Sequence, residues 1–339
     1  MSALLVAGRR ARARSARRAT LVLAALVIAL VVLTLCIGER SYSPAQVIGV
    51  LFGQDVPGAS FTVGRLRIPR ATTGLLVGVA FGLAGSLFQT MLRNPLASPD
   101  IIGISYGSSA VAVVSIALFG ASGAAVSALG VAGGLLVAVV VYLLSYRGGV
   151  LGSRLILTGI AVGGLLVAVI QYALTRADVY KAADALRWLT GSLSSAFADG
   201  VPPLAIALVV LVPAALLLVR RVSALQLGDD SATALGVPAE RTRLLVLLVG
   251  VALISVATAS AGPIAFVAFL SGPIAGRLVR GAPVILPAAL VGAALVLGAD
   301  FVGAHLLPTT MPVGVITGIV GAPYLLWLLS RSSSTGGRP

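Results

Sequence analysis

The 339-residue chain is 58% hydrophobic and only 10% charged, with a mean hydropathy of +1.08, which is more apolar than a water-soluble core of this size requires. One histidine and one cysteine exclude a His/Cys metal cluster and an intrachain disulfide, and no cofactor is expected. The net charge of +14 suits basic residues that meet anionic lipid at a membrane face, so membrane lipid is an expected contact and nucleic acid is not.

About ten apolar runs are long enough to cross roughly 30 Å of hydrocarbon as helices of about 20 residues. The runs are continuous instead of alternating, and helices satisfy every backbone group within the segment, so a β-barrel is disfavoured. The sequence therefore predicts an all-α polytopic membrane protein, with spans near 19–37, 71–92, 101–120, 122–144, 155–174, 201–219, 244–261, 263–279, 283–307 and 313–329.

A basic segment precedes the first run and looks like the start of a signal peptide. No small-x-small cleavage site follows, and Leu35 before Cys36 does not fit a lipoprotein cleavage site, so we expect an uncleaved first helix. Residues 1–18 are then a basic tail, 19–331 the transmembrane domain and 332–339 a short polar tail. Because arginine-rich loops stay in the cytoplasm and ten spans return the chain to its starting side, both termini are predicted to be cytoplasmic.

Three arginines, Arg65, Arg67 and Arg70, fall on the predicted outer side, against the positive-inside trend. An exposed ion pair adds only about 0 to 1 kcal/mol, so folding alone explains the cluster poorly. We expect an acidic partner there, and contact with outer lipid headgroups is the alternative.

The loop YRGGVLGSR at 146–154 joins two predicted spans on the cytoplasmic side, and its paired glycines, Gly148 and Gly149, suit a hinge. A plain positive-inside turn is the alternative. The only lysine is Lys181, so a G-x-x-x-x-G-K-[ST] phosphate loop cannot be formed. The chain is therefore predicted to be no ATPase, and an ATPase that powers it would be a separate chain on the cytoplasmic face.

The polar loop LGDDSATALGVPAERTR at 227–243 also falls on the cytoplasmic side. Residues 229–231 offer N-cap oxygens and Gly236 is a suitable C-terminal cap, which predicts one short helix. A second short helix can start at Pro238, with Glu240 near its positive end. Two interpretations stay open here: a docking element built from two short helices, and a solvated loop whose arginines hold the topology.

Two glycine-proline pairs, Gly262-Pro263 and Gly272-Pro273, are predicted to interrupt one short span twice. Such breaks mark substrate paths in transporters, whereas close helix packing is the alternative at any single glycine. Asp300 is the only carboxylate clearly inside an apolar run, where an ionisable group is a functional hypothesis by default. One carboxylate is nevertheless a thin basis for coupling to protons or sodium.

Four segments resemble the permease subunits of iron-siderophore, haem and vitamin B12 ABC importers, the FecCD or BtuC-like family. The resemblance runs from about residue 20 to 331 and is carried by RIPRATTGLLVGVAFGLAGSLFQTMLRNPLASPDIIGISYGSSA (67–110), RWLTGSL (187–193), LGDDSATALGVPAERTR (227–243) and MPVGVITGIVGAPYLLWLL (311–329).

This resemblance implies ten helices per subunit in the bacterial cytoplasmic membrane, two permease subunits around a central pathway, two ATPase subunits below and a substrate-binding protein above. A ferric siderophore is the expected cargo, with haem or vitamin B12 as the alternative in the same family. An ion-coupled secondary transporter, which would need intramembrane charges and repeat symmetry, and a channel, which would need a repeated filter sequence, fit the sequence less well.

The resemblance also assigns residues. Arg67 and Arg70 would receive glutamates from the two lobes of the binding protein, with Arg65 beside them and His305 as the nearest match to a further basic docking site. The inner gate would contain Arg147, Gly148, Gly149 and Ser153. The pair of coupling helices that seats in the ATPase would contain Leu227, Gly228, Asp229, Ala234, Leu235, Gly236, Val237, Pro238, Glu240, Arg241 and Arg243.

One departure from the family pattern concerns the partner permease. Many members carry Pro-His-Ile-x-Arg where this chain reads SGPIAGR at 271–277, so the histidine is missing. Variants of this kind resemble one half of siderophore permeases built from two different subunits. The sequence therefore favours a heterodimer with a sister permease over a homodimer.

Overall fold

The computed structural model describes residues 2–99, 103–146, 152–194, 196, 198–279 and 283–333. Over these ranges all regular structure is helical, as the sequence predicts. The helices are α1 Ser2–Cys36, α2 Pro44–Leu51, α3 Ala59–Phe61, η1 Thr62–Arg67, α4 Ile68–Leu92, α5 Ile104–Phe119, α6 Ala124–Ser145, α7 Gly152–Arg176, α8 Val179–Leu189, η2 Ala198–Gly200, α9 Val201–Leu225, α10 Asp229–Ala234, α11 Ala239–Ala261, α12 Val267–Val279, α13 Ile285–Phe301, η3 Val302–Leu306 and α14 Val313–Ser333.

The number of spans agrees with the prediction. Within the described ranges, seven helices are long and apolar enough to cross a membrane. The three shorter apolar helices, Ile104–Phe119, Val267–Val279 and Val313–Leu328, bring the total to ten. Runs of this length form helices because each helix satisfies its own backbone hydrogen bonds where no water is available.

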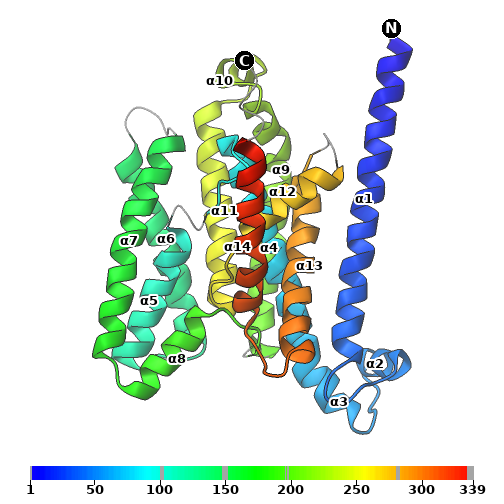
Figure 1. Cartoon of the computed structure of the whole chain (residues 1–339), viewed down its shortest axis with the longest axis vertical. Helices are drawn as coiled ribbons and strands as arrows, with labels where there is room; N and C mark the ends of the chain where they lie inside the picture. Colours follow the sequence, from blue (N-terminus) through cyan, green and yellow to red (C-terminus); the bar gives the residue numbers. More distant parts are fainter. Residues whose placement is uncertain are drawn as a thin grey trace.

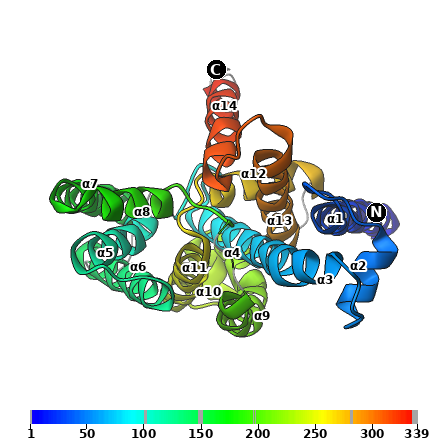
Figure 2. The ribbon, with the colours of Figure 1, turned by 90° about the horizontal axis from the view of Figure 1, so that it is seen from below.

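The long helices run side by side, and the bundle has two distinct ends (Figure 1). The start of α1, the short helix α10 and the C-terminal end of α14 lie at one end, which we call the α10 end. Helices α2, α3 and α8 lie at the other end, which we call the α3 end. Seen along the bundle, α4 is central, with α9, α11, α12 and α13 around it, α5 to α8 on one side and α1 to α3 on the other (Figure 2).

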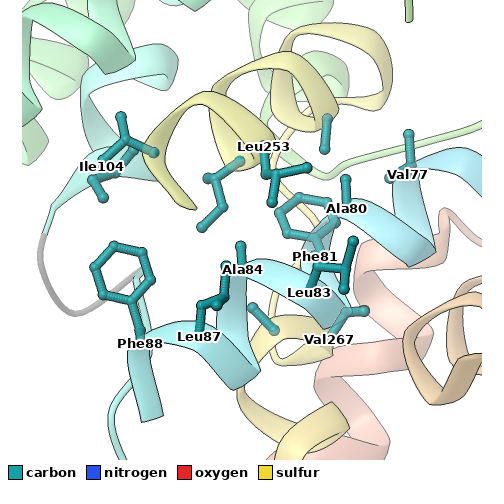
Figure 3. Packing of buried hydrophobic residues seen from close by; sticks show 14 of the residues in the cluster. Val77, Ala80, Phe81, Leu83, Ala84, Leu87, Phe88, Ile104, Leu253 and Val267 are labelled. Atoms are coloured by element: carbon teal, nitrogen blue, oxygen red, sulfur yellow. The ribbon is translucent and has the colours of Figure 1, made fainter. Parts of the chain in front are cut away.

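Helix α4 forms the middle of the core. Its apolar span is 78% buried, compared with 22% to 61% for the other six long spans. Phe81, Leu87 and Phe88 of α4 are fully buried, and they belong to one cluster with Leu253 of α11 and Val267 of α12 (Figure 3). Burial on all sides explains why the hydrophobic residues of α4 follow no single stripe.

Glycines allow α4 to pack backbone against backbone. A methyl group on Gly82 would overlap the carbonyl of Ala288 in α13, and one on Gly85 would overlap the carbonyl of Ala268 in α12. Small residues at helix contacts give close packing in lipid, where no hydrophobic force drives helices together. The glycines therefore fix α4 against two neighbouring helices.

The first helix begins earlier than the sequence predicts. Helix α1 runs without a break from Ser2 to Cys36, so the basic segment is helical from Ser2 onward and continuous with the first span. A 35-residue helix is roughly 52 Å long at about 1.5 Å per residue, which exceeds the roughly 30 Å of hydrocarbon. Part of α1 must therefore extend beyond the apolar layer.

The expected double break of the short span is wrong at its second position. Gly262 and Pro263 do separate α11 from α12, but α12 continues through Gly272 and Pro273. Proline at 273 has no N–H for the carbonyl four residues earlier, that of Phe269. The side-chain amide of Gln89 from α4 donates a hydrogen bond to that carbonyl, at 2.9 Å. The helix survives because a neighbouring helix supplies the missing donor.

Candidate functional site

The polar loop 227–243 forms one short helix, not two. Helix α10 covers Asp229–Ala234, and Gly236 follows it with φ +77°, the left-handed conformation expected of a C-terminal cap. The expected second short helix is instead the first part of α11, which starts at Ala239 and continues into the membrane span. It is not separate because nothing between Glu240 and the apolar run breaks a helix.

The predicted N-cap of α10 also differs. Gly228 occupies the N-cap position with φ 110°, and no side chain caps the helix. Asp229 instead directs its carboxylate to two arginines from other helices. One oxygen lies 2.8 Å from Arg93, at the C-terminal end of α4, and the other lies 2.7 Å from Arg243 of α11. Arg243 also pairs with Glu240 at 3.4 Å.

These contacts set the protonation of Asp229. The hydrogen bonds from Arg243 are the main cause that holds the pKa of the Asp229 carboxyl below its ordinary value of 3.8. Partial burial opposes this shift, and the charges of Arg243 and Arg93 reinforce it. The carboxylate is therefore ionised at neutral pH and available as an ion-pair partner.

Two large apolar side chains are exposed on this otherwise polar loop. Leu227 and Leu235 are 65% and 63% exposed, and Ala234 and Gly236, the two neighbours of Leu235, are exposed as well. Figure 1 places this loop at the tip of the α10 end, beyond α9 and α11. The remaining expected members, Val237, Pro238 and Arg241, follow directly at the same tip. Both leucines are therefore accessible to a partner protein.

A cavity of about 440 Å³ opens beside this loop. It is lined by side chains from the C-terminal end of α4, the end of α9 and α12, among them Gln89, Arg93, Gln226, Gly272 and Pro273. Arg93 therefore both lines the cavity and binds Asp229. The second glycine-proline pair contributes to this cavity without breaking its helix.

The first glycine-proline pair lies at a junction of three segments. The amide of Ser192 donates to the carbonyl of Ala261 at 2.8 Å, and the amide of Gly314 donates to the carbonyl of Gly191 at 3.1 Å. Gly262 and Gly191 both have positive φ, and a side chain on either would overlap the other segment's backbone. The segment RWLTGSL is thereby joined to the end of α11 and the start of α14.

At the α3 end, two of the predicted docking arginines are bound within the chain. Arg70 makes two hydrogen bonds of 2.8 Å to Asp300, whose side chain is only 4% exposed. Arg67 donates to the carbonyl of Leu35 at 2.9 Å and to that of Arg40, and its guanidinium lies 5.2 Å from the ring centre of Tyr42. Asp300, whose role the sequence left open, is thus the ion-pair partner of Arg70.

The other two predicted docking residues are more accessible. Arg65 is exposed and makes no hydrogen bond or ion pair with any residue that the structure describes. His305 is exposed in the π-helical turn η3, and its ring lies 5.2 Å from that of Phe301. The charges of Arg67, Arg70 and Asp300 all act on His305, so these four residues lie near one another.

The predicted gate cannot be placed. Arg147, Gly148 and Gly149 lie outside the described residues, and Ser153 is described only as backbone in the first turn of α7. Sequence reasoning missed two residues of the site, Gln89 and Arg93. Pro273 inside an apolar run indicates that another side chain must donate to a helix carbonyl, and Gln89 is that donor. Nothing in the sequence near Arg93 indicated that it binds Asp229.

Comparison with known proteins agrees with this architecture. Residues 26–331 match the FecCD transport family. The ferric enterobactin transport system permease proteins FepG and FepD of Escherichia coli (strain K12) are 39% and 38% identical to the chain. The alignment with FepG covers 87% of this chain and 90% of the relative, and that with FepD covers 90% and 92%.

A solved structure described as an inward-facing, metal-chelate type ABC transporter has a TM-score of 0.81 at 28% identity, and it covers 93% of this chain and 99% of its own. The chain therefore belongs to the FecCD transport family. It is a multi-pass permease of the bacterial cytoplasmic membrane, and as a permease it is a transport component without its own ATPase domain.

Proposed function

We propose that this member of the FecCD transport family is the permease subunit of an ABC importer that moves a ferric siderophore into the cell. Two copies of a separate ATPase would power it. The observation that carries the proposal is the similarity to two ferric enterobactin permease proteins over about nine-tenths of their length. Haem and vitamin B12 remain the alternative cargo, because permeases of one family share the fold.

We assign the α10 end to the cytoplasm and the ATPase. The basic start of α1 lies at that end, and arginine-rich segments stay in the cytoplasm. The exposed leucines of the 227–243 loop offer an apolar contact for the ATPase, and the two ends of the bundle separate this contact from the outer arginines. The loop 146–154, with Arg147, Gly148, Gly149 and Ser153, would act as the cytoplasmic gate.

The extracytoplasmic binding protein would dock at the α3 end. Arg65, Arg67 and Arg70 lie there beside His305, and the positive charges of the three arginines suit acidic side chains on a partner. Arg65 is the best candidate for a direct contact, since Arg67 and Arg70 already bind groups of this chain. Docking through Arg70 would require its partner to compete with Asp300.

The second permease subunit is proposed to be a different chain. FepG and FepD are both permease proteins of one ferric enterobactin transport system, and this chain matches both at nearly equal identity. The missing histidine in 271–277 supports the same assignment. A central pathway would then form between this chain and a sister permease.

Uptake of labelled substrates tests the proposal, with radioiron in the ferric siderophores and haem and radiocobalt in cobalamin. A strain that lacks this gene should lose uptake of one ferric siderophore from a panel that also contains haem and cobalamin, and the restored gene should recover it. A strain that lacks only the ATPase should show the same loss. Uptake of haem or cobalamin as the sole affected substrate would replace the siderophore assignment, and uptake that survives ATP depletion but not a protonophore would contradict the ABC mechanism.

A further inference from the structure

Helix α10 has few means of holding its own position. It contains six residues, begins at Gly228 without a side-chain cap, and buries only Ala232. So short a helix is marginal by itself, because its few hydrogen bonds do not offset the cost of ordering the backbone. Its placement at the tip of the bundle must therefore come from contacts with the long helices.

The strongest of these contacts converge on one carboxylate. Asp229 binds Arg93, which lies 136 residues earlier in the chain, and Arg243, which lies 14 residues later. The two arginines come from different helices, so the carboxylate fixes α10 in two directions. A hydrogen bond between a carboxylate and a guanidinium is charge-assisted, so it is stronger and more directional than an apolar contact.

Arg93 is held in an unusual conformation. It caps the end of α4 with φ 52°, and it is one of two residues other than glycine with positive φ among those described. Residues in this conformation cluster at functional sites, where surrounding structure maintains them. Helix α4 therefore ends at Arg93, the residue whose guanidinium binds Asp229 of α10.

Helix α4 is a rigid attachment point. Its span is the most buried of the seven long spans, and Gly82 and Gly85 seat it directly on the backbones of α13 and α12. A displacement of α10 that reaches Arg93 therefore acts on the centre of the bundle. If α10 contacted only an exposed loop, its displacement would move that loop and leave the long helices in place.

We infer that Asp229 is the residue that positions the coupling helix: its carboxylate joins α10 to α4 through Arg93 and to α11 through Arg243, so that movement of the ATPase reaches the buried core. This inference rests on the proposed function, because it takes α10 as the ATPase contact. Asp229 is a positioning residue and touches no cargo.

A purely structural role would give a different result. The side chains of Asp229 and Arg93 are 47% and 43% exposed, and exposed ion pairs contribute little to folding. Loss of the carboxylate should therefore loosen α10 and weaken coupling, while the permease still folds and inserts. Asp230, the next residue, is exposed and has no ion pair with any described residue, so Asp230→Asn removes the same charge as a matched control.

The first test uses the permease alone in lipid nanodiscs, with Cys36→Ser and a nitroxide on Ala234→Cys. We expect Asp229→Asn to increase nitroxide mobility, Asp229→Glu to restore most of the order, and Asp230→Asn to change little. Equal mobility in Asp229→Asn and Asp230→Asn would overturn the inference. This measurement needs neither ATPase nor siderophore, so its failure is distinct from failure of the proposed function.

The second test uses the assembled importer and measures how strongly the loaded binding protein stimulates ATP hydrolysis. Asp229→Asn should lower the stimulation by about fivefold or more with the ATPase still bound, which is the scale of a typical coupling between sites. Arg93→Gln should have a similar effect, and the double variant should be no worse than either single one. Additive losses would show that the two residues act separately and would overturn the inference.

Discussion

Helix α4 carries an arginine ion pair at each end, and the two pairs differ in burial. At the α3 end, Arg70 meets Asp300, whose side chain is 4% exposed. At the α10 end, Arg93 meets Asp229, whose side chain is 47% exposed. The first pair joins α4 to α13 with its carboxylate buried and the Arg70 side chain 29% exposed, whereas the second connects α4 to a short helix at the tip.

Burial decides what each pair can do. Removing one partner of a buried pair leaves an uncompensated charge in a medium of low dielectric constant, so the pair matters for folding. The exposed pair costs little to break, since water solvates the separated charges. The Arg70–Asp300 pair therefore suits a fixed contact between α4 and α13. The Arg93–Asp229 pair suits a contact that moves during transport.

The largest effect should come from the exposed 227–243 loop at the α10 end. Replacing Leu235 and Gly236 with glutamate puts two charges on the proposed ATPase contact and forces a side chain onto φ +77°. We expect ATP-driven uptake to fall to background while the protein remains in the membrane at a normal level. Leu235→Met is the conservative control. Normal uptake and normal ATPase stimulation in the double variant would remove this loop from the contact.

The buried pair should dominate stability. Arg70→Ala leaves the carboxylate of Asp300 buried without its partner, and we expect a loss of about 3 to 5 kcal/mol. Thermal unfolding in detergent should show it, and adding Asp300→Asn should recover part of the loss. Arg65→Ala, on an exposed arginine nearby, should stay within about 0.5 kcal/mol. Equal melting temperatures of Arg70→Ala and Arg65→Ala would show that the Arg70–Asp300 pair contributes nothing to stability.

Docking of the binding protein should respond to Arg65 with a moderate effect. Arg70→Glu would place two carboxylates together and break the Arg70–Asp300 pair, so Arg65→Glu is the cleaner change. We expect affinity for the binding protein to fall about three- to tenfold in low salt and the difference to shrink in high salt. An unchanged affinity in low salt would leave Arg65 as a contact for lipid headgroups.

The smallest effect concerns pH at the α10 end. The pKa of Asp229 is lowered in the folded chain, so the ion pairs contribute fully above 3.8 and are lost as pH falls through the lower folded-state value. Nitroxide mobility at position 234 should stay constant from about pH 8 to about pH 5 and rise only in strong acid. Asp229→Asn should lack this acid transition. A transition near neutral pH would mean that another group controls α10.

Several features could be predicted from local sequence because their physical causes are local. The thickness of the hydrocarbon layer sets the length of a spanning run, so counting apolar runs gave ten spans. Gly236 was identified as a helix end because glycine tolerates the left-handed conformation. The second short helix was wrong because a helix start at Pro238 says nothing about where that helix ends.

By itself, the sequence determined the all-helical membrane class, the ten spans, the family and the presence of a polar loop between two spans. Only the tertiary structure decided that α12 passes through Pro273, because the donor that replaces the missing N–H comes from Gln89 on another helix. It also decided which arginine meets which carboxylate, since Arg70 and Asp300 are 230 residues apart and Arg93 and Asp229 are 136 apart. Apolar length is a local property of the chain, whereas the pairing of charges depends on which helices pack together.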